Sequence, residues 1–219
     1  MRSRQQAAPG PPESGVKALE VDTPHGPARA LIHAADSPLG ALILGHGANG
    51  AVDAPDLVAA THVALAARFS VALVEQPYRV AGRRSPAPAR QLDAAWTAVV
   101  QWLRETELSG LPLIVGGRSA GARVACRTAA DTGPLAVLCL AFPLHAPGRS
   151  ETAMSKTRQP ELDGVQVPVL VVQGARDPFG MPRPSATRRV VTVTGNHSLK
   201  TDLDAVSAAV GDWLASVVS

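Results

Sequence analysis

Residues 111–125 read Leu111-Pro-Leu-Ile-Val-Gly-Gly-Arg-Ser-Ala-Gly-Ala-Arg-Val-Ala125. A short apolar run leads into the pattern G-x-S-x-G, and an alanine-rich segment that favours a helix follows at once. A turn this sharp places its central residue, Ser119, at a positive φ angle, and it brings the incoming strand and the outgoing helix almost into contact. The residues two before and two after the serine must then be very small, as Gly117 and Gly121 are. The stretch therefore predicts a strand, a tight turn and a helix, with Ser119 presented at the turn.

The composition indicates one globular domain that does not bind nucleic acid. A chain of 219 residues is long enough to bury a sizeable core, and its 46% of hydrophobic residues but only 3% of aromatic ones predict a core of Ala, Val and Leu. The 21 basic against 18 acidic residues leave a net charge of +3. No concentrated basic patch with interleaved aromatic residues lies behind that excess, which argues against a nucleic-acid partner.

The N-terminal segment and the two cysteines bear on where in the cell the protein is located. Residues 1–14, which include Ala-Ala-Pro-Gly-Pro-Pro-Glu-Ser, predict a disordered leader, so that 15–219 form a single domain. No apolar segment has the length of a signal-peptide core or a membrane span, which favours the cytoplasm and no membrane partner. Cys126 and Cys139 do not form a C-x-x-C pair, and we expect them to be buried thiols in a reducing compartment.

Short apolar runs alternate with longer helical patterns along the chain. Residues 16–21 and 28–33 predict an opening antiparallel hairpin. Further strands are expected at 40–45, 70–74, 111–115, 136–142, 168–173 and 190–193. Helices are expected at 56–69, at 89–107, after the turn at Ser119, and from Thr201 as the N-cap to the C-terminus. This order predicts an α/β fold with a mostly parallel central sheet and helices on both faces.

Three loops that follow strands carry the residue types of an acyl-transfer site. Ligand sites in parallel sheets lie at the carboxyl ends of the strands. A serine hydroxyl needs a nearby base, for which His197 is the candidate, and the base needs a carboxylate to orient it, for which Asp177 is the candidate. The catalytic residues predicted are therefore Ser119, Asp177 and His197, in that chain order.

A developing oxyanion needs two backbone N–H donors. We expect one from Ala120, directly after the serine, and the other from Ala48 in the glycine-rich loop 45–50, with Gly47 as the alternative donor. His46 in the same loop is expected to brace it. The predicted substrate-binding residues are Gly47, Asn49, Tyr78 and Phe179.

Each of these residues also has a simpler interpretation when it is taken alone. Asp177 precedes a proline and would suit a turn, His197 would suit a loop or cap, and loop 45–50 would suit an ordinary or phosphate-binding turn. That loop lacks the Lys of a P-loop, and all three features follow the expected strands in the expected order. The other histidines show no metal-ligand spacing. The sequence predicts no metal and no cofactor.

The chain resembles the α/β-hydrolase superfamily over residues 16–219, and within it the small cap-less group of testis-expressed and NSL-complex α/β-hydrolase-like proteins, neighbours of dienelactone hydrolases. The segments that carry this resemblance are Gly45-His-Gly-Ala48, Pro77-Tyr-Arg79, Ala81-Gly-Arg-Arg84, Gly116-Gly-Arg-Ser-Ala-Gly121, Phe142-Pro-Leu-His-Ala-Pro-Gly148, Gln173-Gly-Ala-Arg-Asp-Pro-Phe-Gly180 and His197-Ser-Leu199. The chain departs from the group at Ala120 and Ala122, where the group has Met and Gly, and at Asn49, where a small residue is common.

The resemblance implies that a lid domain is missing. Relatives insert a lid after the strand that ends near Phe142, but only about 25 residues separate Phe142 from Pro168 here. We therefore expect a shallow, exposed site for small acyl substrates, without interfacial activation.

Three functions remain open from the sequence. The first is a serine hydrolase that cleaves carboxylic esters or thioesters through an acyl-enzyme, acting as a monomer or homodimer on small molecules. The second is an acyl transferase or thioesterase for carrier-bound substrates, with Arg83, Arg84 and Arg118 near an anionic group. The third is an interaction module that keeps the fold without turnover.

Overall fold

The computed structural model describes residues 15–146 and 157–217. The strands of the sheet are β1 (Lys17–Val21), β2 (Ala28–His33), β3 (Gly40–Gly45), β4 (Phe69–Glu75), β5 (Leu113–Arg118), β6 (Ala136–Leu140), β7 (Val169–Gly174) and β8 (Arg188–Val193). The helices are α1 (Pro55–Ala66), α2 (Pro77–Val80), α3 (Ala89–Glu105), α4 (Ala120–Arg127), α5 (Ala129–Thr132), α6 (Gln159–Asp163) and α7 (Leu203–Val217).

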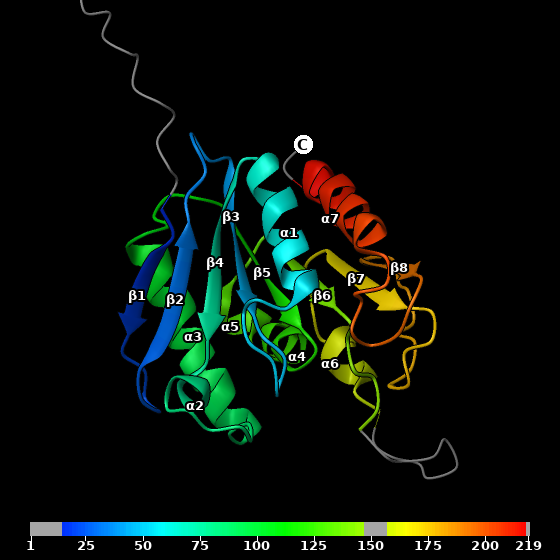
Figure 1. The fold of residues 1–219 in the computed structure, drawn as a ribbon, viewed down its shortest axis with the longest axis horizontal. Helices are drawn as coiled ribbons and strands as arrows, with labels where there is room; N and C mark the ends of the chain where they lie inside the picture. Colours follow the sequence, from blue (N-terminus) through cyan, green and yellow to red (C-terminus); the bar gives the residue numbers. More distant parts are fainter. Residues whose placement is uncertain (1–14, 147–156, 218–219) are drawn as a thin grey trace, which may run out of the picture.

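All these strands form one sheet in the order β1-β2-β4-β3-β5-β6-β7-β8 (Figure 1). Strand β2 pairs antiparallel with both β1 and β4, and every other neighbouring pair is parallel. In the register of β3 and β5, Gly45 lies opposite Gly117, so the loops after these two strands begin side by side. The expected hairpin and mostly parallel sheet are confirmed.

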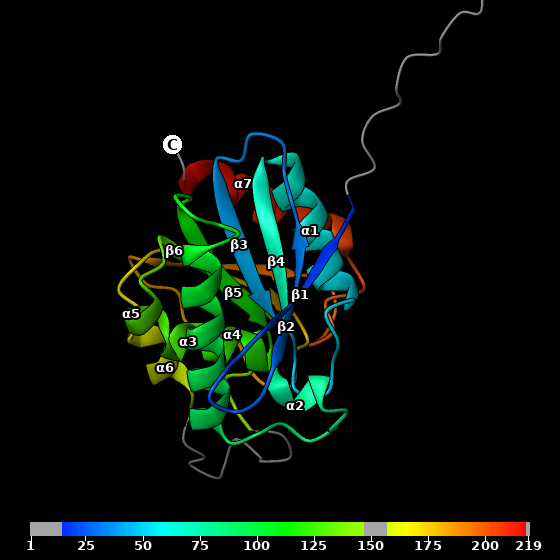
Figure 2. The same ribbon diagram turned by 90° about the vertical axis from the view of Figure 1, so that its left-hand side faces the viewer.

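Helices cover both faces of the sheet. Helices α1 and α7 pack together on one face, and α3, α4, α5 and α6 lie on the other, as the edge-on view in Figure 2 shows. Two apolar clusters fill the spaces between these layers. One includes Trp96 of α3 and Val124 of α4, and the other includes Leu57 of α1 and Trp213 of α7. The sheet therefore separates two cores.

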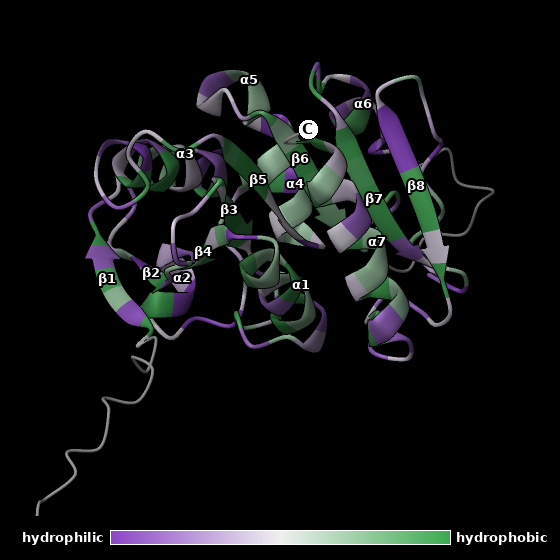
Figure 3. Ribbon diagram, turned by 90° about the horizontal axis from the view of Figure 1, so that it is seen from above, coloured by the Kyte–Doolittle hydropathy of each residue, from purple (hydrophilic) through white to green (hydrophobic). Residues whose placement is uncertain are grey.

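The central strands are mostly apolar because both of their faces are covered. Every residue of β3, β6 and β7 is buried. In Figure 3, most of β7 is hydrophobic up to its carboxyl end, where Gln173 lies, whereas the edge strand β8 begins with hydrophilic residues. This pattern explains why the inner strands could be recognised as unbroken apolar runs.

Several element boundaries differ from the sequence prediction. Strand β5 continues to Arg118, directly before the turn, instead of ending at residue 115, and β6 ends at Leu140 instead of 142. Helix α7 begins at Leu203, and Asp202 rather than Thr201 caps it, because Asp202 Oδ1 accepts the Ala205 N–H at 3.1 Å. The short helices α2, α5 and α6 were not predicted, since single turns carry little periodic signal.

The two cysteines face each other in the core between α4 and β6. Both are free and buried, with their sulfur atoms 3.5 Å apart. Contact with Cys126 and burial raise the pKa of the Cys139 thiol. Across residues 15–146 and 157–217, no three His, Cys, Asp or Glu side chains gather closely enough to hold a metal ion.

None of the helices in the described ranges combines the length and apolar character that a membrane crossing needs. The predicted leader, 1–14, lies outside the described residues, as do 147–156.

Candidate active site

The turn between β5 and α4 holds Ser119 in a conformation that few non-glycine residues adopt. Ser119 has φ 53° and ψ −107°, and its N–H donates to the carbonyl oxygen of Leu140 at 2.9 Å. A Cβ atom at Gly121 would overlap the carbonyl oxygen of Gly45, and one at Gly117 would meet the same oxygen. The predicted positive φ and the need for very small residues at both positions are thus confirmed.

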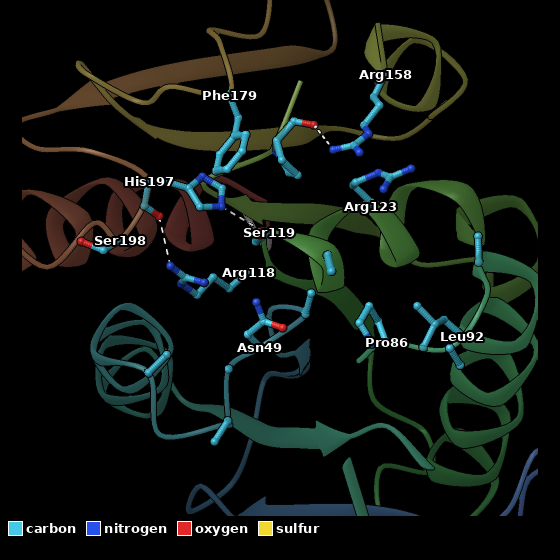
Figure 4. A pocket seen from close by; sticks show the side chains of 18 of the residues that line it. Asn49, Pro86, Leu92, Arg118, Ser119, Arg123, Arg158, Phe179, His197 and Ser198 are labelled. Atoms are coloured by element: carbon cyan, nitrogen blue, oxygen red, sulfur yellow. Dashed lines mark hydrogen bonds between the residues drawn. The ribbon is translucent and has the colours of Figure 1, made fainter. Parts of the chain in front are cut away.

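The structure brings Ser119, His197 and Asp177 together from three loops at the carboxyl end of the sheet. His197 lies between β8 and α7, and its Nε2 is 2.9 Å from Ser119 Oγ (Figure 4). Its Nδ1 is 2.8 Å from Asp177 Oδ2, in the loop after β7. A carboxylate only accepts hydrogen bonds, so Nδ1 donates to Asp177 and Nε2 is left to accept the Ser119 hydroxyl proton.

Asp177 is itself held in place by two donors. Gln173 Nε2 donates to Oδ2 at 2.8 Å, and the Phe179 N–H donates to Oδ1 at 2.9 Å. The side chain of Asp177 is only 1% exposed. Gln173 was not predicted as a site residue. The sequence feature that could have indicated it is a polar residue at the end of the apolar run 168–173, and the Gln173 side chain is fully buried here.

The loop after β3 lies against the turn at Ser119. Its segment from Gly47 to Gly50 is closed by a hydrogen bond from the Gly50 N–H to the Gly47 carbonyl at 3.1 Å. Ala48 and Ala120 both line the cavity in front of Ser119. Ala120 is the first residue of α4, where backbone N–H groups have no acceptor within the helix.

His46 and Tyr78 support this loop from behind. His46 Nε2 accepts the Gln76 N–H at 3.1 Å, and its Nδ1 donates to the Gly47 carbonyl at 2.7 Å. Burial lowers the pKa of His46, which favours the neutral ring that this pair of bonds requires. The Tyr78 hydroxyl donates to the Ala48 carbonyl at 2.7 Å, and burial raises the pKa of Tyr78 to about 12.

Arg118, next to the serine, joins three segments of the site. Its Nη2 donates to the His197 carbonyl at 3.1 Å, and its Nε lies 3.0 Å from Oδ2 of Asp56. Its Nη1 also lies close to Gly47, where a Cβ atom would be 2.8 Å away. Asp56 is fully buried in the first turn of α1, and burial raises its pKa against the opposing effect of Arg118. The sequence analysis did not predict this ion pair.

Ser119 opens into a cavity of about 800 Å³. Two of the predicted substrate-binding residues, Asn49 and Phe179, line it, whereas Gly47 and Tyr78 lie outside its lining. The Phe179 ring packs edge-on against the His197 ring, with centroids 4.4 Å apart. Ser119 is partly exposed in this cavity.

The arginines around the cavity differ from those that the sequence suggested. Arg83 and Arg84 do not line it, and Arg83 instead borders a separate hollow of about 330 Å³ beside α2. Arg123, Arg127 and Arg158 line the cavity together with Arg118. Arg123 and Arg127 belong to α4, and Arg158 directly precedes α6. No motif in the sequence marks these three arginines as neighbours of Ser119.

Residues 39–206 match a family described as an alpha/beta hydrolase domain. The chain belongs to this family. The match covers the strands from β3 to β8, the turn at Ser119 and the loops that hold Asp177 and His197.

Several solved structures share the fold of this alpha/beta hydrolase over almost the whole length of its chain. An α/β serine hydrolase without a lid from Xanthomonas campestris has 18% identity and a TM-score of 0.71, with 95% of this chain and 97% of that chain covered. Est1E from Butyrivibrio proteoclasticus has 16% identity and a TM-score of 0.74, with 92% and 98% covered. A dienelactone hydrolase from Anabaena variabilis has 16% identity and a TM-score of 0.72, with 92% and 97% covered.

The family fold is present here without a lid domain. Between β6 and β7 the chain has only residues 141–168, and the described part of that segment forms the single short helix α6. The expected absence of a large lid is therefore confirmed, as in the lid-less hydrolase from Xanthomonas campestris.

Proposed function

We propose that this protein is a serine hydrolase that cleaves carboxylic esters or thioesters through an acyl-enzyme. The observation that carries the proposal is the hydrogen-bonded relay from Ser119 Oγ to His197 at 2.9 Å and from His197 to Asp177 at 2.8 Å. It starts from a serine held at φ 53° at the mouth of a cavity. A base within hydrogen-bond reach of the hydroxyl, itself oriented by a carboxylate, is what serine nucleophiles require.

In the acylation step, Ser119 Oγ attacks the carbonyl carbon of the substrate and its proton passes to His197 Nε2. Asp177 stabilises the imidazolium that forms. The backbone N–H groups of Ala120 and Ala48 donate to the carbonyl oxygen as it becomes negative. Attack produces a tetrahedral intermediate. Its collapse breaks the ester or thioester bond, and the leaving alcohol or thiol takes the proton from His197 Nε2.

Deacylation repeats the sequence with water as the nucleophile. His197 Nε2 accepts a proton from the water, which attacks the acyl carbon, and then returns a proton to Ser119 Oγ as the acid leaves. Side chains and backbone N–H groups of the chain, together with water, supply every group in this scheme, so the proposal includes no cofactor. We also propose that residues 15–219 form one catalytic domain, which acts as a monomer or homodimer. We propose a cytoplasmic location, because the reducing conditions there suit the two free thiols.

The structural neighbours support ester chemistry. They include serine hydrolases, several esterases and a dienelactone hydrolase, and Est1E is known with ferulic acid bound. Together with the family match, these names favour a hydrolase over an interaction module on the same fold.

Labelling with a fluorophosphonate tests the proposal directly. We expect the adduct on Ser119 by mass spectrometry, and we expect Ser119→Ala to abolish it and to lower kcat for ester hydrolysis by about 10³-fold or more. Ser198→Ala is the matched control, because Ser198 lines the same cavity but bonds to Asn196. Folded protein that remains unlabelled would instead support the non-catalytic interaction module.

A further inference from the structure

The cavity in front of Ser119 is lined by four arginines, and three of them have carboxylate partners. Arg118 pairs with Asp56 at 3.0 Å. The Nη2 atoms of Arg123 and Arg127 each lie 2.6 Å from a carboxylate oxygen, of Glu161 and Asp93 respectively. These three guanidinium groups are thus part of the protein's internal ion pairs.

Arg158 has a different environment. Its Nη1 donates to the carbonyl oxygens of Pro143 at 3.0 Å and His145 at 3.1 Å. No carboxylate of the described residues lies within ion-pair distance of it. Carbonyl groups orient the guanidinium but carry no net charge, so they form no ion pair with it. Burial, and then the nearby positive charge of Arg123, lower the pKa of Arg158, and the carboxylate of Glu161 opposes this only in part.

The cluster as a whole has one positive charge in excess. Among the described residues, the guanidinium groups of Arg123, Arg127 and Arg158 are accompanied by only two carboxylates, those of Asp93 and Glu161. Figure 4 shows Arg158 reaching down from the segment before α6 toward Arg123 on α4. Elsewhere in the lining, Asp53 and Lys200 contribute one charge of each sign, so the excess remains.

The wall near this cluster is apolar. Pro86, Ala87 and Leu92, from the loop before α3 and from α3 itself, line the same cavity. In Figure 4, Pro86 and Leu92 lie on the side of Ser119 away from His197. A ligand that fills this space meets both an apolar surface and an unpaired guanidinium group.

We propose that the cavity accepts esters or thioesters that carry a free carboxylate in addition to the scissile bond, and that Arg158 binds this carboxylate. A single excess positive charge matches the single negative charge of a carboxylate better than the double charge of a phosphate. This inference deepens the proposed hydrolase function and rests on it for turnover, although binding of the carboxylate does not require Ser119. It also identifies Arg158, rather than Arg83, Arg84 or Arg118, as the residue that meets an anionic group.

Matched substrates test this specificity. One pair is the 4-nitrophenyl half-ester of glutaric acid against 4-nitrophenyl valerate, which places the carboxylate on the acyl part. The other is 4-(valeryloxy)benzoate against 4-methylphenyl valerate, which places it on the leaving group. We expect a higher kcat/KM for the charged member of at least one pair. Equal or lower values for the charged member in both pairs would overturn the proposal.

Variants at Arg158 assign the preference. Arg158→Gln should lower kcat/KM for the preferred charged ester by about 10- to 100-fold, as expected for a lost bond between charged groups, and change the neutral ester by less than about threefold. Arg158→Lys should restore part of the preference. Arg90→Gln, an exposed arginine of α3 outside the cavity lining, is the control. An equal loss for both esters would mean that Arg158 only holds its loop.

A binding experiment separates this proposal from the hydrolase function. Ser119→Ala is titrated with monomethyl glutarate and with methyl valerate, and binding is followed by NMR. Binding of the charged ester that is lost in Ser119→Ala/Arg158→Gln supports the carboxylate site even if the wild type is not labelled by a fluorophosphonate. Labelling without any preference for the charged ester would support the hydrolase and reject the carboxylate site.

Discussion

Arg118 illustrates how one residue outside the proposed catalytic relay can position it. It follows the glycines of β5, precedes Ser119, and contacts both the loop of His197 and the start of α1. Its partner Asp56 is fully buried, and Arg118 is only 18% exposed. Breaking a buried pair is costlier than its net contribution, because one charge remains buried without a partner.

Arg118→Gln should lower the free energy of unfolding by about 3 kcal/mol near pH 8. The pKa of Asp56 is already raised by burial, and loss of Arg118 removes an influence that lowers it. The native state therefore binds the Asp56 proton more tightly than the unfolded state does. The loss of stability should be smallest below the ordinary pKa of an aspartate and should grow as the pH rises through the raised pKa.

Chemical denaturation of the variant and the wild type at pH 5 and pH 8 measures this difference. The double variant Asp56→Asn/Arg118→Gln, which removes the unpaired charge, should recover part of the stability at pH 8. A destabilisation that is independent of pH, or that the double variant does not relieve, would show that the ion pair is not its origin.

At the scale of elements, the site depends on how closely β3, β5 and α4 approach one another. Gly45 lies opposite Gly117 in the sheet, and Gly121 at the start of α4 packs on the same backbone. This approach places the loop that contains Ala48 next to Ser119. The glycines of the motif are therefore required by packing between elements, as well as by the turn itself.

Gly121→Ala should disrupt this approach. Its methyl group would overlap the Gly45 carbonyl oxygen and lie 2.9 Å from that of His46, and neither backbone atom can yield without moving β3. We expect a loss of about 3 kcal/mol or more in unfolding free energy, together with loss of fluorophosphonate labelling. Gly15→Ala, where the added atom meets nothing within 4 Å, is the control in thermal unfolding. A stable, fully labelled variant would contradict the packing argument.

At the scale of the whole molecule, the absence of a lid determines how substrate reaches Ser119. The serine is partly exposed at a cavity of about 800 Å³, and the described segment between β6 and β7 holds only the short helix α6. In the described ranges, no large domain covers Ser119. Access should therefore be independent of a lipid or micelle surface.

The rate of hydrolysis of a short-chain ester should rise smoothly with substrate concentration. It should show no sudden increase when the concentration exceeds the solubility limit of the ester. Initial rates measured with tributyrin on both sides of that limit test this expectation. A sharp increase once droplets form would indicate that some segment covers Ser119 in water and is displaced at the interface.

The local sequence pattern alone predicted the succession of strands along the chain, the turn at Ser119 and the order of Ser119, Asp177 and His197. This was possible because parallel strands with both faces buried appear as unbroken apolar runs, and because their carboxyl ends all meet at one edge. Residues that follow those runs are gathered by the topology itself. The positive φ of Ser119 followed equally from local sterics.

Only the tertiary structure decided which side chains meet between segments that are distant in the chain. Tyr78, expected to contact substrate, donates to the Ala48 carbonyl instead, and Arg118, which does line the cavity, is paired with the buried Asp56. Arg158 had no distinguishing pattern at all. Such pairings depend on strand order and on which helix covers which face, and these are settled by packing across the sheet rather than by the residues beside them in the sequence.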